Sequence, residues 1–197
     1  FVPREERDRK AVLVDVGYLC TDVMIIEGDA VTFMKTVDQG GAQMAVDLAY
    51  GLDIQLDSAE TLKRGYVFGV SGTEEDYEIN QDGGTSVRRS QVGTVIEKRA
   101  GELCDAIKEA LEESAIHLGN WSAVYLTGGG IAINRGGREF LSSRLGRTVR
   151  EMPKKTVKMS NPAFTSVLGL LDLAIDTAEE NDNGGGLGGF FRNLFNS

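Results

Sequence analysis

The sequence has 197 residues, of which 41% are hydrophobic and 26% are charged, and its formal net charge is −9. Such a chain is long enough to bury a sizeable core. The acidic balance argues against nucleic acid as a partner, because nucleic-acid phosphates attract basic surfaces. No signal peptide and no apolar run that could span a bilayer is present.

Few residues suit metal or redox chemistry. The single histidine, His117, and the two cysteines, Cys20 and Cys104, do not cluster at metal-ligand spacing. Both cysteines fall in apolar segments, so we expect two buried free thiols in a reducing cytoplasm.

The first half of the chain predicts hairpins followed by helices. Apolar alternation and turn residues predict strands at 11–16, about 22–26 and 31–37. Helical spacing predicts a helix from residue 40 to near Gly51 and a second from Asp57, where Asp57 and Glu60 form a capping box. Short β-prone pieces at 66–70, 77–79 and 85–87 precede a long helix, whose apolar stripe is Ile96, Ala100, Leu103, Cys104, Ile107, Leu111 and Ala115.

The second half begins with a buried strand, "SAVYLT" at 122–127, that runs directly into three glycines. A short helix at 138–146 and a strand at 148–152 follow. Asn161 as a cap and Pro162 in the first turn predict the start of a long helix. The composition then changes at Asn181 to a glycine-rich linker.

Two segments stand out chemically. "VLVDVGYLCTDVMIIEGD" at 12–29 predicts a hairpin with Asp15 before its turn and Asp22 after it. The triplet Gly128–Gly130 allows the backbone to approach a ligand closely, because glycine has no Cβ. Either segment alone is equally well explained as a tight turn, so the order of the segments carries the information.

That order resembles the second lobe of the actin-like ATPase superfamily, and most closely the FtsA family of bacterial cell-division proteins. In that family the hairpin is the second phosphate loop and "LTGGG" at Leu126–Gly130 is the adenosine motif. "GGAQMAVDLAYGL" at 40–52, "SAETLKRGY" at 58–66 and "NPAFTSVLGLL" at 161–171 are similar to family segments at corresponding places. The resemblance covers nearly the whole chain.

The resemblance implies an α/β fold of the ribonuclease H-like, actin-like ATPase type, a mixed sheet with helices and a small inserted α/β subdomain. Residues 1–51 and 120–180 would form the core subdomain, and 52–119 the inserted one. Residues 181–189 would be a linker and 190–197 an amphipathic, membrane-targeting tail.

On the phosphate side, the resemblance implies that Asp15 orients water around a Mg²⁺ ion. Backbone N–H groups near Gly17 and Thr21 would meet the β- and γ-phosphates. The family usually carries two small residues after the first glycine of the loop, whereas this chain carries Tyr18 and Leu19. Because bulky side chains can fill the space of a phosphate, we expect ATP and Mg²⁺ to bind poorly. The structural alternative is that Asp15 only ends a strand.

On the adenosine side, the resemblance implies that Glu60 and Lys63 reach the ribose and adenine. The glycines Gly128, Gly129 and Gly130 would pass under the adenosine. The alternatives are a capping-box role for Glu60 and a solvated surface position for Lys63.

Catalysis by this chain alone is not expected. The other phosphate loop and the water-activating carboxylate of the resembled proteins belong to a first lobe, which would precede Phe1. We therefore expect the chain to be a piece of a longer protein, without a catalytic residue of its own. The intact protein would be at most a weak ATPase, because phosphoryl transfer relies on charges gathered from several sides.

The end of the chain predicts a membrane-surface anchor. Apolar residues at helical spacing follow the linker, and a short helix with an apolar face on a flexible tether suits a membrane surface. The alternative is that the tail docks on its own domain or on a neighbour. The residues expected to bind the membrane are Leu187, Phe190, Phe191, Leu194 and Phe195.

Together these features predict a cell-division adaptor that is cytoplasmic and peripheral at the inner face of the membrane. By resemblance its partners would be the tubulin-like protein FtsZ, other copies of itself and the membrane, with no nucleic acid. One alternative is a PilM-like adaptor of pilus or secretion assembly, against which the tail argues. Another is a small-molecule kinase lobe of the same superfamily, against which Tyr18 and Leu19 argue.

Overall fold

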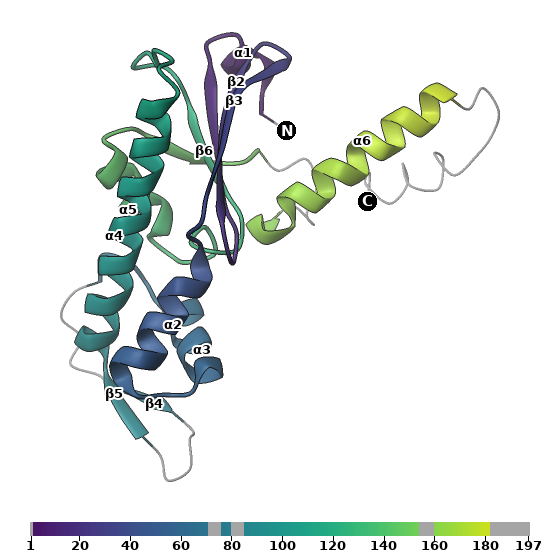
Figure 1. The fold of residues 1–197 in the computed structure, drawn as a ribbon. Helices are drawn as coiled ribbons and strands as arrows, with labels where there is room; N and C mark the ends of the chain where they lie inside the picture. Colours follow the sequence, from purple (N-terminus) through teal and green to yellow (C-terminus); the bar gives the residue numbers. More distant parts are fainter. Residues whose placement is uncertain (1, 71–75, 80–84, 154–159, 182–197) are drawn as a thin grey trace.

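The computed structural model describes residues 2–70, 76–79, 85–153 and 160–181, and Figure 1 shows its arrangement. The predicted linker, except for Asn181 at the end of α6, and the predicted membrane-binding residues lie outside this part of the chain. Within it, no helix is both long and apolar enough to cross a bilayer. The elements in chain order are α1 (Arg4–Arg7), β1 (Ala11–Val16), β2 (Thr21–Glu27), β3 (Ala30–Val37), α2 (Gly41–Leu52), α3 (Leu56–Gly65), β4 (Asp76–Ile79), β5 (Thr85–Arg88), α4 (Arg89–Glu113), β6 (Val124–Thr127), α5 (Gly137–Leu145), β7 (Val149–Glu151), the 3₁₀ turn η2 (Pro162–Phe164) and α6 (Thr165–Asn181).

A mixed five-stranded sheet forms the centre of the fold, in the order β3-β2-β1-β6-β7. β2 pairs antiparallel with β1 and β3, whereas β6 pairs parallel with β1 and β7. This arrangement confirms the predicted α/β class. The predicted bounds of β1 are correct, and β2 and β3 each begin one residue earlier than predicted.

Helices cover one face of the sheet, and the main core lies between these helices and the sheet. Val12, Val14 and Val16 alternate along β1 and are fully buried on this face. Burying a side chain of this kind is worth roughly 1.5–3 kcal/mol. Figure 1 shows α4 running along the molecule from the β4–β5 hairpin to the far end of the sheet. Its buried residues are Val92, Ile96, Ala100, Gly101, Leu103, Cys104, Ile107 and Ala110.

The predicted apolar stripe of this helix is confirmed from Ile96 to Leu111 but not at Ala115. α4 begins at Arg89 and ends at Glu113, so Ala115 lies outside it, in a left-handed conformation with φ 52°. Cys104 is buried, and burial raises the pKa of its thiol to about 12. Cys20 is a free thiol as predicted but is only half-buried, because it lies in the turn between β1 and β2.

The helices α2 and α3 and the hairpin β4–β5 lie at one end of the molecule (Figure 1). The predicted strand at 66–70 is wrong: these residues form an irregular segment and a turn. Tyr66 and Phe68 are nevertheless buried, because their rings pack edge to face at 5.1 Å. The Phe68 amide also donates to the carbonyl of Arg135. The apolar residues of this segment are therefore buried without being part of a strand.

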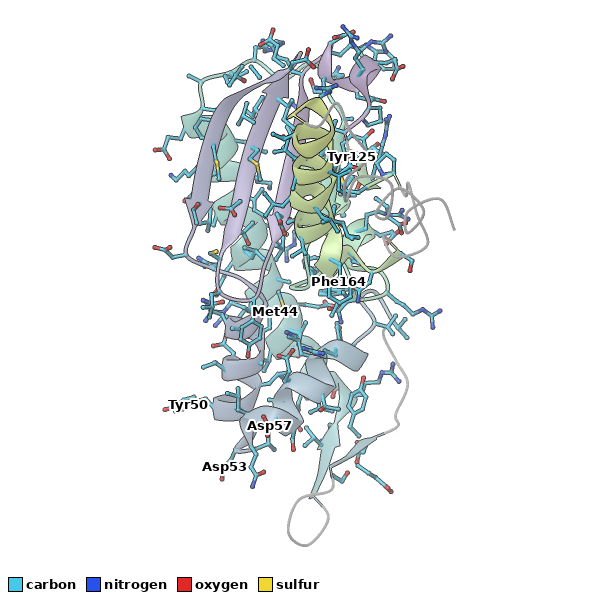
Figure 2. The ribbon with its side chains drawn as sticks, turned by 90° about the vertical axis from the view of Figure 1, so that its right-hand side faces the viewer. Met44, Tyr50, Asp53, Asp57, Tyr125 and Phe164 are labelled. Atoms are coloured by element: carbon cyan, nitrogen blue, oxygen red, sulfur yellow. The ribbon has the colours of Figure 1, made fainter. Side chains whose placement is uncertain are left out.

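The last helix, α6, extends away from the sheet (Figure 1). Asn161 is a cap as predicted, since its side chain accepts a hydrogen bond from the Ala163 amide at 3.0 Å, but it caps the 3₁₀ turn η2, and the long helix begins only at Thr165. Val167, Leu170 and Leu173 are each more than 60% exposed. Figure 2 shows Phe164 at the end of α6 nearest to α2. Large apolar side chains of α6 therefore remain exposed in this structure.

Candidate functional site

The hairpin β1–β2 positions the first predicted residues. Asp15 pairs with Asp22 and Val16 with Thr21 across the two strands. The turn between them is closed by a hydrogen bond from the Gly17 amide to the Cys20 carbonyl, at 2.9 Å. A Cβ on Gly17 would lie 2.9 Å from the same carbonyl oxygen, so only glycine fits without a shift.

The glycine triplet packs directly against this hairpin. The Gly130 amide donates to the Val16 carbonyl at 2.7 Å. A Cβ on Gly128, whose φ is +91°, would lie 2.2 Å from that same oxygen. A Cβ on Gly130 would lie 2.4 Å from the Gly17 carbonyl oxygen. The glycines of the triplet therefore already pack closely against the backbone of the hairpin.

Gly41, at the start of α2, lies where the hairpin and the triplet meet. Its amide donates to the Gly17 carbonyl at 3.0 Å. A Cβ on Gly41 would lie 2.8 Å from the Gly130 Cα and 3.1 Å from the Lys63 Nζ. The hairpin, the triplet and α3 thus meet around Gly41. The fold brings together the two sides of the site that the sequence predicts.

Lys63 is buried at this junction, with only 1% of its side chain exposed. Its ammonium lies 2.8 Å from the Glu60 carboxylate and donates to the Gly41 carbonyl at 3.3 Å. The Tyr18 ring lies over the ammonium, with 5.3 Å between Nζ and the ring centroid, a cation–π geometry. The alternative of a solvated Lys63 is therefore excluded, and the Tyr18 ring lies beside the buried ammonium.

The predicted capping box is wrong. α3 begins at Leu56 with Gln55 as its cap residue, and this residue makes no side-chain cap bond. Glu60 instead pairs with Lys63 and with Arg64, the latter at 2.7 Å. Burial of Glu60 opposes its ionisation, but hydrogen bonds from these two cations prevail and lower its pKa below the usual value of 4.5.

Asp15 is held by a residue that the sequence did not indicate. The Ser166 hydroxyl, in the first turn of α6, donates to the Asp15 carboxylate. The preceding turn is tied to the triplet, because the Pro162 carbonyl accepts from the Gly128 amide at 3.1 Å and from the Thr127 hydroxyl at 3.0 Å. Ser166 lies in the family-like segment 161–171, but no role is predicted for it from the sequence, because its partner is distant in sequence.

Two of the predicted phosphate contacts are engaged within the protein. Thr21 is fully buried, and its hydroxyl donates to the Gln39 carbonyl at 2.7 Å. The Gly17 amide is used by the Cys20 carbonyl. A phosphate would have to compete with these bonds, so their proposed role stays a prediction.

A pocket of about 710 Å³ lies between the segment that follows the triplet and the root of α6. Ile133 and Asn134 line it from one side, and Asn161, Pro162 and Thr165 from the other. Of the described residues that line it, none was predicted as a site residue. The only signal in the sequence was their position beside the glycines and the helix cap. No group of three or more His, Cys, Asp and Glu residues that could hold a metal occurs in the described ranges.

Comparison with solved structures defines the fold. MreB 5 of Spiroplasma citri bound to AMPPNP superposes with a TM-score of 0.70 at 16% identity, over 89% of this chain and 56% of that one. The MamK double helical filament gives 0.65 at 18% identity, over 83% of this chain and 54% of that one. The fold is that of the actin-like ATPases.

Comparison of sequences defines the family. The model of the family described as cell division protein FtsA matches residues 12–169. The cell division protein FtsA of Neisseria meningitidis is 24% identical over 205 residues, which cover 93% of this chain and 50% of that protein. The chain belongs to the FtsA family and spans about half the length of this relative.

Proposed function

We propose that this chain is part of a cell-division adaptor that binds an adenine nucleotide weakly, self-associates and tethers an FtsZ ring to the membrane. The observation that carries the nucleotide assignment is the convergence of the hairpin, the triplet and Lys63 on Gly41. The structurally similar MreB 5 binds AMPPNP, which supports a nucleotide in the same fold.

The residues present fit Mg²⁺ with a nucleotide. Mg²⁺ keeps several waters and is usually held by one or two carboxylates together with the phosphates. Asp15 supplies one half-buried carboxylate, oriented by the Ser166 hydroxyl. When bound, the ion would neutralise charge on the phosphates. Asp15 would hold it through water.

Binding is expected to be weak because Tyr18 covers Lys63. A nucleotide must displace the ring before it reaches the ammonium, so the affinity is reduced by the fraction of molecules in which the ring has moved. We propose no hydrolysis by this chain alone. Phosphoryl transfer relies on charges gathered around the phosphate from several sides.

The adaptor role rests on the family and on the tail. Leu187, Phe190, Phe191, Leu194 and Phe195 are proposed to insert into the membrane surface at the cytoplasmic side. One such tail with a single Arg192 binds weakly, so useful attachment requires many tails on one polymer. Polymer formation is supported by the filament of the structurally similar MamK. The smaller, inserted subdomain is the proposed contact for FtsZ.

The test is co-sedimentation with anionic liposomes at several protein concentrations. The chain is compared with a version truncated at Asn183, each with and without an FtsZ protein. We expect pelleting that depends on the tail and steepens with concentration, and that carries FtsZ with it. Absence of pelleting at every concentration would contradict the membrane role, and pelleting without FtsZ would contradict the tether.

A further inference from the structure

We propose that Asn134 is a positioning residue, whose side-chain amide holds the two walls of the adenosine side in place. The inference rests on the nucleotide binding proposed above. One wall is α3, which carries Glu60 and Lys63 and meets the triplet at Gly41. The other is the segment 131–136, which follows the triplet; residues 132–136 line the pocket described above, which α3 does not line.

Asn134 is almost fully buried, with 6% exposure. Its Nδ2 donates to the Lys63 carbonyl at 2.7 Å and to the Tyr66 carbonyl at 3.0 Å, with a longer bond to Arg64 at 3.4 Å. These carbonyls stand at the end of α3, where a helix has few intrahelical donors left for its last acceptors, and the Lys63 carbonyl also accepts from the Tyr66 amide at 3.2 Å. Of the two polar groups of the Asn134 side chain, only the NH₂ group can donate to carbonyls, and this fixes the orientation of the side chain.

The backbone of Asn134 is fixed as firmly as its side chain. Its amide donates to the Ile131 carbonyl, and its carbonyl accepts from the Gly137 amide, both at 3.0 Å. The amide side chain is thus mounted rigidly on the segment after the triplet and reaches across to α3. It holds the backbone of the same Lys63 whose ammonium meets Gly41.

Without this amide the last turn of α3 has more freedom relative to the triplet. Ligand affinity then falls in proportion to the fraction of molecules whose two walls remain in place. The loss should be common to every ligand with an adenosine group. A residue that only stabilised the helix would change the unfolding equilibrium and leave the affinity of the folded protein unaltered.

The experiment measures adenosine, ADP and ATP binding with Mg²⁺, by calorimetry, to the unaltered chain and to Asn134→Ala. We expect all three affinities to fall by a similar factor, about tenfold. The matched control is Ser142→Ala. The Ser142 hydroxyl donates to the Arg147 carbonyl at 2.7 Å at the end of α5, so this variant also removes a side-chain bond that closes a helix. It should leave the three affinities unchanged.

Three results would overturn the proposal: unchanged affinities in Asn134→Ala, a loss confined to ADP and ATP, or an equal loss in Ser142→Ala. If the unaltered chain binds none of the three ligands, the proposed nucleotide function fails separately. Hydrogen exchange then decides the role of Asn134. Faster exchange in Asn134→Ala confined to residues 60–66, with α4 unchanged, supports it, and unchanged exchange there contradicts it.

Discussion

Lys63 and Glu60 form a charge pair at the centre of the site, and the two partners differ in exposure. The lysine side chain is 1% exposed and the glutamate 19%. Removing the carboxylate would leave a buried ammonium without its counter-charge, which is far more costly than losing a surface pair. The pair therefore contributes to the stability of the fold as well as to the site.

The prediction at this scale concerns Glu60→Gln. At pH 7 the variant should unfold more easily by roughly 3 kcal/mol. Because the folded state lowers the pKa of Glu60, the stabilisation is present above the usual value of 4.5 and is lost as the pH falls through the lowered pKa. The two proteins should then converge in urea unfolding measured from pH 7 down to acid pH. Glu139→Gln, at a pair whose carboxylate is 60% exposed, is the control and should change stability little. A difference that persists or grows in acid would contradict the assignment.

The helices α4 and α6 both carry large apolar side chains, yet these side chains have opposite surroundings. Ile107 of α4 is fully buried in the main core, whereas Leu170 of α6 is 69% exposed. Truncation of a large apolar side chain to alanine should therefore have different consequences in the two helices. Ile107→Ala should lower the free energy of unfolding by about 2–5 kcal/mol. Leu170→Ala should change it by less than about 0.5 kcal/mol. Denaturant unfolding of both variants provides the measurement, and a large loss in Leu170→Ala would show that α6 is packed in solution.

Secondary structure could be predicted wherever one local signal dominates. The alternating valines and the flanking turn defined β1, and Asn161 with Pro162 marked the root of α6. Prediction failed where contacts with other residues determine the local structure. Tyr66 and Phe68 have the apolar pattern of a strand but are buried by ring packing. Glu60 has the spacing of a cap but is drawn to Lys63.

At the scale of the whole molecule, the candidate site was predictable only in part. The glycines and Asp15 could be found because their order along the chain is that of a known family. Ser166 and Asn134 could not, because each acts on a residue more than 65 positions away that only the fold brings near. The hairpin, α3, the triplet and α6 each supply one portion of the site.

The central claim is that the junction around Gly41 binds an adenine nucleotide and that Tyr18 limits this binding. Titration calorimetry of ATP with Mg²⁺ into the unaltered chain and into Tyr18→Ser tests it most directly. Tyr50→Ser is the matched control, because Tyr50 is 93% exposed and projects from α2 away from the junction (Figure 2). The account predicts weak binding by the unaltered chain and by Tyr50→Ser, and about tenfold tighter binding by Tyr18→Ser. Equal or weaker binding by Tyr18→Ser would contradict it.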